Sequence, residues 1–210
     1  MFNRNPYIAV SGAVLFLGAM GGWAVTTVKD LPDYAVAGKA LTLSFIVRQH
    51  GQTPLNNLKP EIEASAGTVQ LRATATRGKG DGQYESTLTL PHAGEWTITI
   101  HSGFMNSGVT LLPLRVIEPG GKAVVLTDAD RGQRLFLAKG CVTCHGQIAV
   151  GPDLTNREFP VEYVKQLLAD PKATFGSRRG ATDMPNLNLS QQEIASLAAF
   201  VGSDKHAASR

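Results

Sequence analysis

The stretch Cys141-Val142-Thr143-Cys144-His145 contains the only two cysteines of the chain and places a histidine directly after the second. Cys-x-x-Cys-His is the attachment pattern of c-type heme. Two thiols at this spacing can each bond one vinyl group of the same porphyrin, and the histidine that follows can bring its imidazole to the iron. The stretch therefore predicts one covalently bound heme, attached at Cys141 and Cys144 and ligated by His145.

Other uses of a nearby cysteine pair are a structural disulfide, half of a zinc site and a redox-active dithiol. Zinc would need further Cys or His ligands at suitable spacing, and the five histidines of the chain provide none. A redox dithiol would lie at a strand-to-helix turn of a βαβ unit, whereas polar, helix-forming sequence precedes Cys141. Heme attachment is the interpretation that fits these residues best.

The length and charge of the chain limit its number of domains and its possible partners. The chain has 210 residues, which is enough for one large domain or two small ones. Its net charge is +3, but the basic residues are scattered, and Arg178-Arg179 is the only adjacent pair. The sequence therefore gives no support to nucleic-acid binding.

Residues 8–28 are uncharged and mostly apolar, with Arg4 before them and Lys29 after them. As a helix this run would span about 30 Å, enough to cross one bilayer. A cleaved signal peptide is the alternative, but its apolar core is usually only about 7 to 15 residues long. We therefore expect a single-pass membrane anchor over residues 1–30. Arg4 indicates a cytoplasmic N-terminus, with everything after Lys29 on the other side of the membrane.

Two glycines in this run, Gly18 and Gly22, are four positions apart. Small residues at this spacing allow a second membrane helix to approach closely, although glycine is also simply common in membrane helices. On the first interpretation the anchor would dock against other membrane subunits.

Between residues 39 and 116 apolar and polar residues alternate with period two. Leu41, Leu43, Phe45 and Val47 show the pattern most clearly, and turns rich in Gly and Pro separate such runs. The pattern predicts half-buried strands, and their number and spacing predict an antiparallel all-β sandwich. The last run contains Pro113, which suits an edge strand or a bulge.

The segment 82–98 has a glycine turn, a strand, a second glycine turn and a strand that opens with Trp96. It resembles YtkA-like and FixH-like domains, which are immunoglobulin-like sandwiches of bacterial membrane proteins. The resemblance implies an immunoglobulin-like sandwich over residues 31–118, which we expect to act as a spacer and docking module.

Some relatives of that class bind copper through Met and His side chains. His92, His101 and Met105 are the only candidates in this segment, and solvated loop residues are the alternative interpretation. A cupredoxin-type centre is excluded, because it needs a cysteine ligand and the segment has none.

A Pro-Gly-Gly run marks the end of the period-two pattern. Such a run continues neither strand nor helix, so we place a linker at residues 119–123. A second domain then covers residues 124–205, and residues 206–210 form a tail. Within this domain Thr127 is a suitable N-cap for a helix that Gly140 would end.

A last helix is expected from the N-cap Ser190 to Val201, with Glu193 completing a capping box. Gly132 and Phe136 share one face of the first helix, and Phe200 lies on the apolar face of the last. This arrangement resembles class I monoheme cytochromes c, in which the first helix crosses the last through a small residue and an aromatic. The resemblance implies an all-α cytochrome c fold with one heme c, attached outside the bacterial cytoplasm.

The same resemblance implies the remaining site residues. The sixth iron ligand of this family is usually a downstream methionine often followed by proline, which here is Met184, with an ordinary core methionine as the alternative. His206 is a poor rival, because it lies in the tail. The segment Gly151-Pro152-Asp153-Leu154 matches the family's Gly-Pro-x-Leu, whose proline carbonyl accepts a hydrogen bond from the proximal imidazole, so Pro152 is the candidate for that role. A middle helix is expected at about residues 161–169, followed by a loop over residues 172–183.

With His145 and Met184 in both axial positions, the iron would have no open site, which favours electron transfer over catalysis. No catalytic residue is expected. We expect a membrane-anchored, periplasm-facing monoheme c-type cytochrome of the bacterial inner membrane, acting as a subunit or tethered shuttle of a respiratory or photosynthetic complex. Its partners would be membrane subunits at the anchor and the sandwich, and a redox partner at the heme edge. A heme-based sensor or enzyme and a copper-delivery protein are the alternatives.

Overall fold

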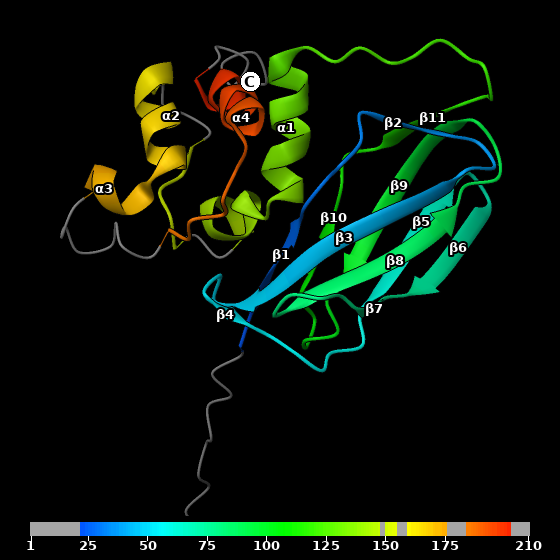
Figure 1. Cartoon of the computed structure of the whole chain (residues 1–210), viewed down its shortest axis with the longest axis horizontal. Coiled ribbons are helices and arrows are strands. Elements are labelled where there is room, and N and C mark those ends of the chain that lie inside the picture. The colour runs from blue at the N-terminus through cyan, green and yellow to red at the C-terminus, as the bar shows by residue number, and fades with distance from the viewer. Residues whose placement is uncertain (1–21, 148–149, 155–158, 176–183, 203–210) are drawn as a thin grey trace, which may run out of the picture.

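The computed structural model describes residues 22–147, 150–154, 159–175 and 184–202 as a two-sheet sandwich followed by a helical part (Figure 1). Every described strand precedes residue 118, and every described helix follows residue 127. The described residues between them form no helix or strand, as the Pro-Gly-Gly run predicts.

The sandwich consists of two sheets whose neighbouring strands are antiparallel, apart from one parallel pair, β2 with β11. The first sheet has the order β1 (Ala24–Val28), β3 (Ala40–Gln49), β8 (Gln83–Thr89) and β7 (Thr76–Arg77), with β4 (Thr53–Pro54) paired to β3. The second has the order β2 (Tyr34–Val36), β11 (Leu114–Ile117), β9 (Gly94–His101), β5 (Glu61–Ala66) and β6 (Val69–Thr74), with β10 (Gly108–Thr110) paired to β9.

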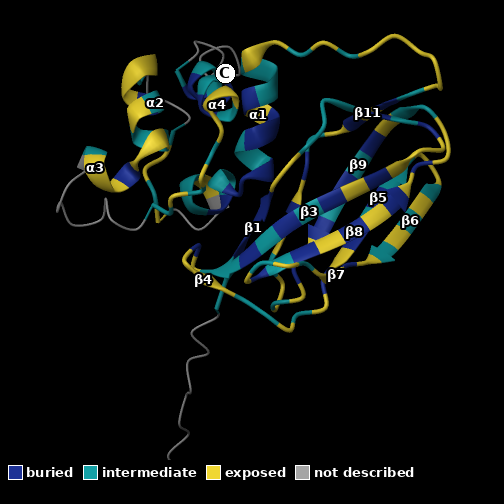
Figure 2. Cartoon of the chain, in the orientation of Figure 1, coloured by how far each residue is buried: buried dark blue, intermediate teal, exposed yellow. Residues whose placement is uncertain are grey.

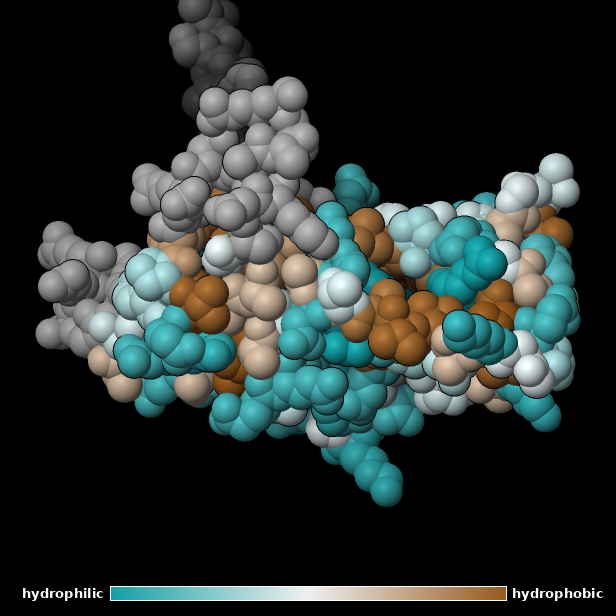
Figure 3. All heavy atoms as spheres, turned by 90° about the horizontal axis from the view of Figure 1, so that it is seen from above, coloured by the Kyte–Doolittle hydropathy of each residue, from teal (hydrophilic) through white to brown (hydrophobic). Residues whose placement is uncertain are grey.

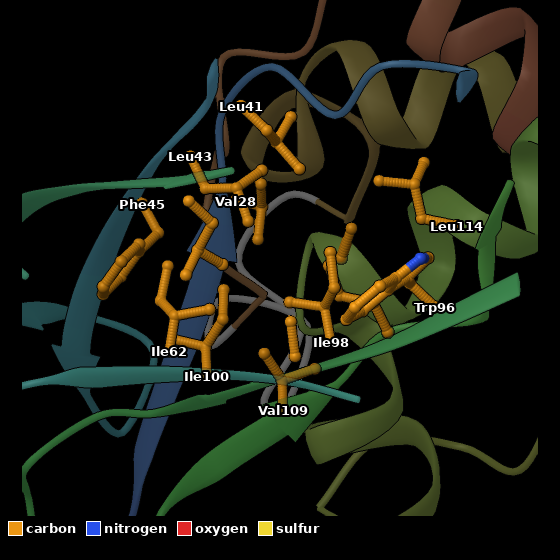
Figure 4. Close-up of a cluster of buried hydrophobic side chains, with 14 of the residues drawn as sticks. Val28, Leu41, Leu43, Phe45, Ile62, Trp96, Ile98, Ile100, Val109 and Leu114 are labelled. Carbon is orange, nitrogen blue, oxygen red and sulfur yellow. The ribbon is translucent and has the colours of Figure 1, made fainter. Parts of the chain in front are cut away.

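The core of the sandwich is built by alternate residues of these strands. Leu43, Phe45 and Val47 of β3 are fully buried, and their neighbours on the chain are more exposed. Bands of buried and exposed residues along β3 and β8 show this alternation in Figure 2. From the opposite sheet, Trp96 and Ile98 fill the same core (Figure 4). The predicted period-two strands are therefore confirmed, and burying each large side chain stabilises the fold by about 2 kcal/mol.

The predicted transmembrane helix at residues 8–28 is wrong. Its last five residues, Ala24–Val28, form β1, which pairs with β3 along its whole length. Among the described residues, no helix is long and apolar enough to cross a membrane. The rest of the predicted anchor, residues 1–21, lies outside the described residues, as do Gly18 and the predicted interaction of this run with a second membrane helix.

The reason for the error lies in how β1 is buried. All five of its residues are buried, because the sandwich core covers one face and the helical part covers the other. A strand that is buried on both faces shows no alternation, so its sequence resembles any other apolar run. Its β-branched residues were the available signal for a strand.

The described residues after 127 form four α-helices and one π-helical turn. They are α1 (Asp128–Ala138), η1 (Thr143–Gln147), α2 (Val161–Ala169), α3 (Pro171–Phe175) and α4 (Gln191–Val201). The predicted caps are confirmed: Thr127 accepts a hydrogen bond from the Asp130 amide at 3.1 Å, and Ser190 and Glu193 form a capping box. Gly140, at φ +77°, follows α1 as the C-terminal glycine.

Helix α3 was not predicted, because residues 172–183 were expected to be a loop. Asp170 explains it: its side chain accepts a hydrogen bond from the Ala173 amide at 3.0 Å, and Pro171 occupies the first helical position. An Asp before a Pro is a usual way to begin a helix. Residues 176–183 of the expected loop are outside the described part of the chain.

The crossing of α1 and α4 holds the helical part together. A Cβ atom at Gly132 would lie 2.0 Å from the Ser196 carbonyl oxygen, so only glycine allows the two backbones to approach this closely. Beside the crossing, the rings of Phe136 and Phe200 are 5.7 Å apart between centroids. The predicted contact of the first and last helices is therefore confirmed.

The helical part is packed directly against the sandwich. Arg134 of α1 donates hydrogen bonds to the carbonyl oxygens of Asp33 at 2.7 Å and Pro32 at 3.1 Å. Ala138, also on α1, belongs to the core of the sandwich. On the face seen in Figure 3, hydrophobic and hydrophilic residues are interspersed over both parts.

Candidate heme site

A cavity of about 360 Å³ lies between the helices and the edge of the sandwich. Most of its wall is apolar, and its lining includes Phe136, Leu154, Phe159, Leu168, Leu197 and Val201. The two cysteines, His145 and Met184 are part of the same lining. The structure thus brings the predicted attachment residues, which are early in the helical part, to the same cavity as a methionine from just before α4.

Cys141 follows α1 and Cys144 lies in η1, and no disulfide joins them. Burial raises the pKa of the Cys141 thiol to about 12, and the neighbouring Cys144 raises it further in the same direction. Burial also raises the pKa of Cys144. Before heme is attached, both thiols would therefore be neutral near pH 7, and both line the cavity.

The imidazole of His145 is held in one orientation by the segment that follows η1. Its Nδ1 lies 2.9 Å from the carbonyl oxygen of Pro152. Because a carbonyl oxygen only accepts hydrogen bonds, Nδ1 carries the hydrogen and Nε2 keeps its lone pair for a metal. A Cβ atom at Gly151 would lie 2.7 Å from Nδ1, so glycine is needed where the chain passes the ring. Such a hydrogen bond fixes the ring and increases its basicity toward a metal.

Met184 lies on the wall of the cavity beside Pro185 and is half-buried. The structure therefore gathers Cys141, Cys144, His145, Pro152 and Met184 at one place. Their roles as attachment points, axial ligands and supporting group stay predictions. Arg178, Arg179 and His206 lie outside the described residues.

The cavity suits the group that the motif implies. Heme c needs two thiols and an imidazole next to each other, a second axial donor, and an apolar enclosure. All of these are present in the lining, with a nitrogen lone pair and a thioether as the two iron donors. The residues fit heme c.

Most of the cavity wall was not predicted from the sequence, and two of its unpredicted residues bear on the site. Val25 of β1 lines the cavity, but sequence reasoning had placed it in the membrane anchor. Lys139 also lines it, although only 5% of its side chain is exposed, and it forms an ion pair with Glu193 of α4. Its position directly before Gly140 and the heme motif was the only available signal.

The copper candidates of the sandwich each have different surroundings. His92 packs against Trp96 with 4.9 Å between ring centroids, and Met105 is 65% exposed. His101 lies 3.9 Å from a carboxylate oxygen of Glu63, beside a shallow hollow with Glu61 and Arg72. Within the described ranges, no three His, Cys, Asp or Glu side chains are grouped so that they could hold a metal ion.

Comparison with solved structures gives only weak likenesses. An Escherichia coli alpha-2-macroglobulin shares 16% identity over 51% of this chain, with a TM-score of 0.36, and this chain spans 7% of its length. A superoxide reductase (neelaredoxin) from Ignicoccus hospitalis shares 13% identity over 48% of this chain and 86% of its own, with a TM-score of 0.30. A CARDB domain from Pyrococcus furiosus, solved with metal ions, shares 11% identity over 47% of this chain and 90% of its own, with a TM-score of 0.29. Likenesses at these TM-scores carry no argument about function.

Comparison with protein families is more informative. No curated protein matches the chain. Residues 127–201 match the family described as cytochrome c oxidase, cbb3-type, subunit III. This range runs from the N-cap of α1 to the end of α4 and includes the whole heme motif. The match and the geometry of the cavity together show that this chain contains a cytochrome c domain, the class of domain that binds heme c and transfers electrons.

Proposed function

We propose that the chain is a monoheme c-type electron carrier rather than an enzyme. The observation that carries this proposal is the pair of axial donors on one cavity: Pro152 leaves Nε2 of His145 free for iron, and Met184 lies on the same lining. With both axial positions filled by the protein, the iron would exchange electrons without binding a substrate.

Heme c supplies the one-electron couple between ferric and ferrous iron. The residues of the chain determine how that couple is held. Cys141 and Cys144 would fix the group covalently, and the hydrogen bond from His145 to Pro152 would keep the imidazole oriented. With heme bound, the thioether of Met184 and the apolar walls would favour the less charged ferrous state and so would raise the reduction potential.

We place the domain outside the bacterial cytoplasm, on the periplasmic side, because c-type heme is attached there in the family that the sequence resembles. The match to a cbb3-type oxidase subunit supports redox partners within a respiratory electron-transfer complex. The exposed apolar side chains at the cavity, Val150 and Tyr163, are 63% and 37% exposed. We expect the redox partner to approach the heme on the side of these two residues.

The first test is whether heme stays on the denatured chain. The chain should be produced in cells that attach heme c, unfolded, and separated from free heme. Covalent heme on the wild type and its loss from the double variant Cys141→Ser, Cys144→Ser would support the proposal. Heme that is absent from the wild type, or that stays on the double variant, would contradict it.

The second test separates an electron carrier from a small-ligand sensor or enzyme. Carbon monoxide added to the ferrous wild type should leave the optical spectrum unchanged, because the thioether of Met184 would occupy the sixth position. Met184→Ala should bind carbon monoxide, whereas the exposed control Met105→Ala should behave as the wild type. Immediate binding of carbon monoxide by the wild type would favour the small-ligand function instead.

A further inference from the structure

We propose that the sandwich is part of the heme site. On this proposal β1, together with the turn after β3, forms the wall of the cleft that the helices leave open, and it holds both the attachment motif and the Met184 segment in place. The inference rests on the proposed function, because it assumes that the cavity holds heme.

The two faces of β1 pack against different parts of the molecule. Ala24 and Val28 belong to the core of the sandwich. Residues that alternate with them along a strand point to the other face, so Val25 and Thr27 point toward the helical part. Val25 is 4% exposed and lines the heme cavity together with the two cysteines and Met184. The sandwich therefore supplies an apolar side chain directly to the cleft.

Contact with the attachment motif is made where α1 ends. A Cβ atom at Gly140 would lie 2.4 Å from a methyl carbon of Val25 and 2.9 Å from the Thr26 carbonyl oxygen. Gly140 is also at φ +77°, so this position needs glycine for both reasons. The hydroxyl of Thr27 donates a hydrogen bond to the Lys139 carbonyl oxygen at 3.3 Å. The backbone just before Cys141 is thus seated on β1.

The turn after β3 lies close to the methionine segment. A Cβ atom at Gly51 would lie 3.7 Å from the ring of Pro185 and 3.6 Å from a methyl carbon of Val25. Pro185 directly follows Met184 and also lines the cavity. The same patch of sandwich therefore lies close to both segments that would hold the heme, and Val25 lines the cavity together with both.

Buried hydrogen bonds hold the helical part against the sandwich. Lys139 donates a hydrogen bond to the Lys29 carbonyl oxygen at 2.6 Å while it pairs with Glu193 on α4. Arg134 is 8% exposed and binds the carbonyl oxygens of Pro32 and Asp33. Separating the two parts would break these hydrogen bonds between buried groups, so the junction resists opening. Figure 1 shows the result, with β1 lying between β3 and the helical part.

A pair of variants on β1 tests the inference. Val25→Ala removes methyl groups from the cavity wall, and Val28→Ala removes the same groups from the other face, where Val28 is fully buried in the sandwich core. We expect Val25→Ala to lower the midpoint potential of the heme and to let carbon monoxide bind the ferrous protein, because water reaches the cleft and the methionine segment loses its support. Val28→Ala should lower the unfolding stability but keep the wild-type potential.

Val25→Thr tests the same role of Val25 without creating empty space in the wall. Threonine keeps the shape and the strand preference of valine, so the variant should fold, yet it places a hydroxyl at the cleft. Its midpoint potential should also be lower than that of the wild type. Wild-type potentials in both Val25 variants, with heme covalently bound and resistant to carbon monoxide, would overturn the inference and leave the electron-carrier function standing. Absence of covalent heme from the wild type would instead overturn that function.

Discussion

Single residues control how closely the segments around the heme site approach one another. Gly132 allows α1 to cross α4, Gly140 allows the motif to rest on β1, and Gly151 allows the chain to pass the His145 ring. An added Cβ would meet backbone at Gly132, a Val25 methyl and the Thr26 backbone at Gly140, and the His145 ring at Gly151. Each glycine therefore allows an approach that a side chain would prevent.

Gly132→Ala should be strongly destabilising. The added Cβ would meet the Ser196 carbonyl at 2.0 Å, so the two helices must move apart, and we expect a loss of about 3 kcal/mol in the free energy of unfolding. Urea unfolding followed by circular dichroism would measure it. Gly80→Ala is the matched control, because its close neighbour is the flexible side chain of Gln83. Equal stabilities of the two variants would contradict the close-packed crossing.

The ion pair of Lys139 with Glu193 should make stability depend on pH. Burial disfavours the charged carboxylate of Glu193, but hydrogen bonds from Lys139 and Ser190 outweigh this effect and lower its pKa below the ordinary 4.5. The stabilisation is therefore complete above pH 4.5 and is lost as the pH falls through the lower pKa of the folded state.

Glu193→Gln tests this dependence. The variant should be less stable than the wild type at pH 7, and the difference should shrink when unfolding is measured below pH 4. A difference that stays constant across this range would show that Glu193 does not act through its charge.

At the scale of elements, local signals in the sequence identified α2 and the caps of α1 and α4, whereas the start of α3 at Asp170-Pro171 was not recognised. Helix α2 occupies residues 161–169 as predicted, and the capping residues of α1 and α4 are those that the sequence indicated. Strand β1 could not be recognised in this way, because its second face is buried by residues more than a hundred positions later. The cavity residues of the cytochrome motif followed from spacing, whereas Val25 is brought to them only by tertiary packing.

Ser190→Ala should weaken α4 at its beginning. The Ser190 hydroxyl accepts a hydrogen bond from the Glu193 amide at 3.2 Å, and the Glu193 carboxylate accepts one from the Ser190 amide at 2.8 Å. Loss of the cap should cost about 1 kcal/mol of stability. Ser190→Asp, which keeps an acceptor at the cap, should stay close to the wild type in the same urea titration. A variant Ser190→Ala as stable as the wild type would show that Glu193 and its other partners hold the helix start alone.

At the scale of the whole molecule, the junction makes one cooperative unit of two parts that are successive in sequence. Ala138 of α1 lies in the sandwich core, and Arg134 and Lys139 bind backbone carbonyls of the sandwich. Sandwich and cytochrome domain should therefore unfold together. Heme absorbance and tryptophan fluorescence report on the two parts separately, because Trp96 is buried in the sandwich.

Arg134→Met should uncouple the unfolding of the cytochrome domain from that of the sandwich. The variant leaves the carbonyl oxygens of Pro32 and Asp33 without their donors in a buried junction, at a cost of about 2 kcal/mol. The midpoint of the heme signal should then fall below that of the tryptophan signal, whereas both should coincide in the wild type. Arg115→Met, at an exposed pair with Glu95, is the control and should leave them coincident. Separate midpoints in the wild type would contradict the single unit.

The hydrogen bond between Thr27 and Lys139 joins residues 112 positions apart, which has a consequence for the order of folding. Closing so long a loop costs chain entropy, so contacts of this kind form after local ones. We expect the sandwich and the helix crossing to form first and the docking of the motif onto β1 to come last. Because docking comes late, Thr27→Val should leave the refolding rate unchanged and raise the unfolding rate, which stopped-flow kinetics would measure. Until that step Cys141 and Cys144 would lie in an open groove, accessible for heme attachment. The docking of the motif onto β1 would then close the groove around the cofactor.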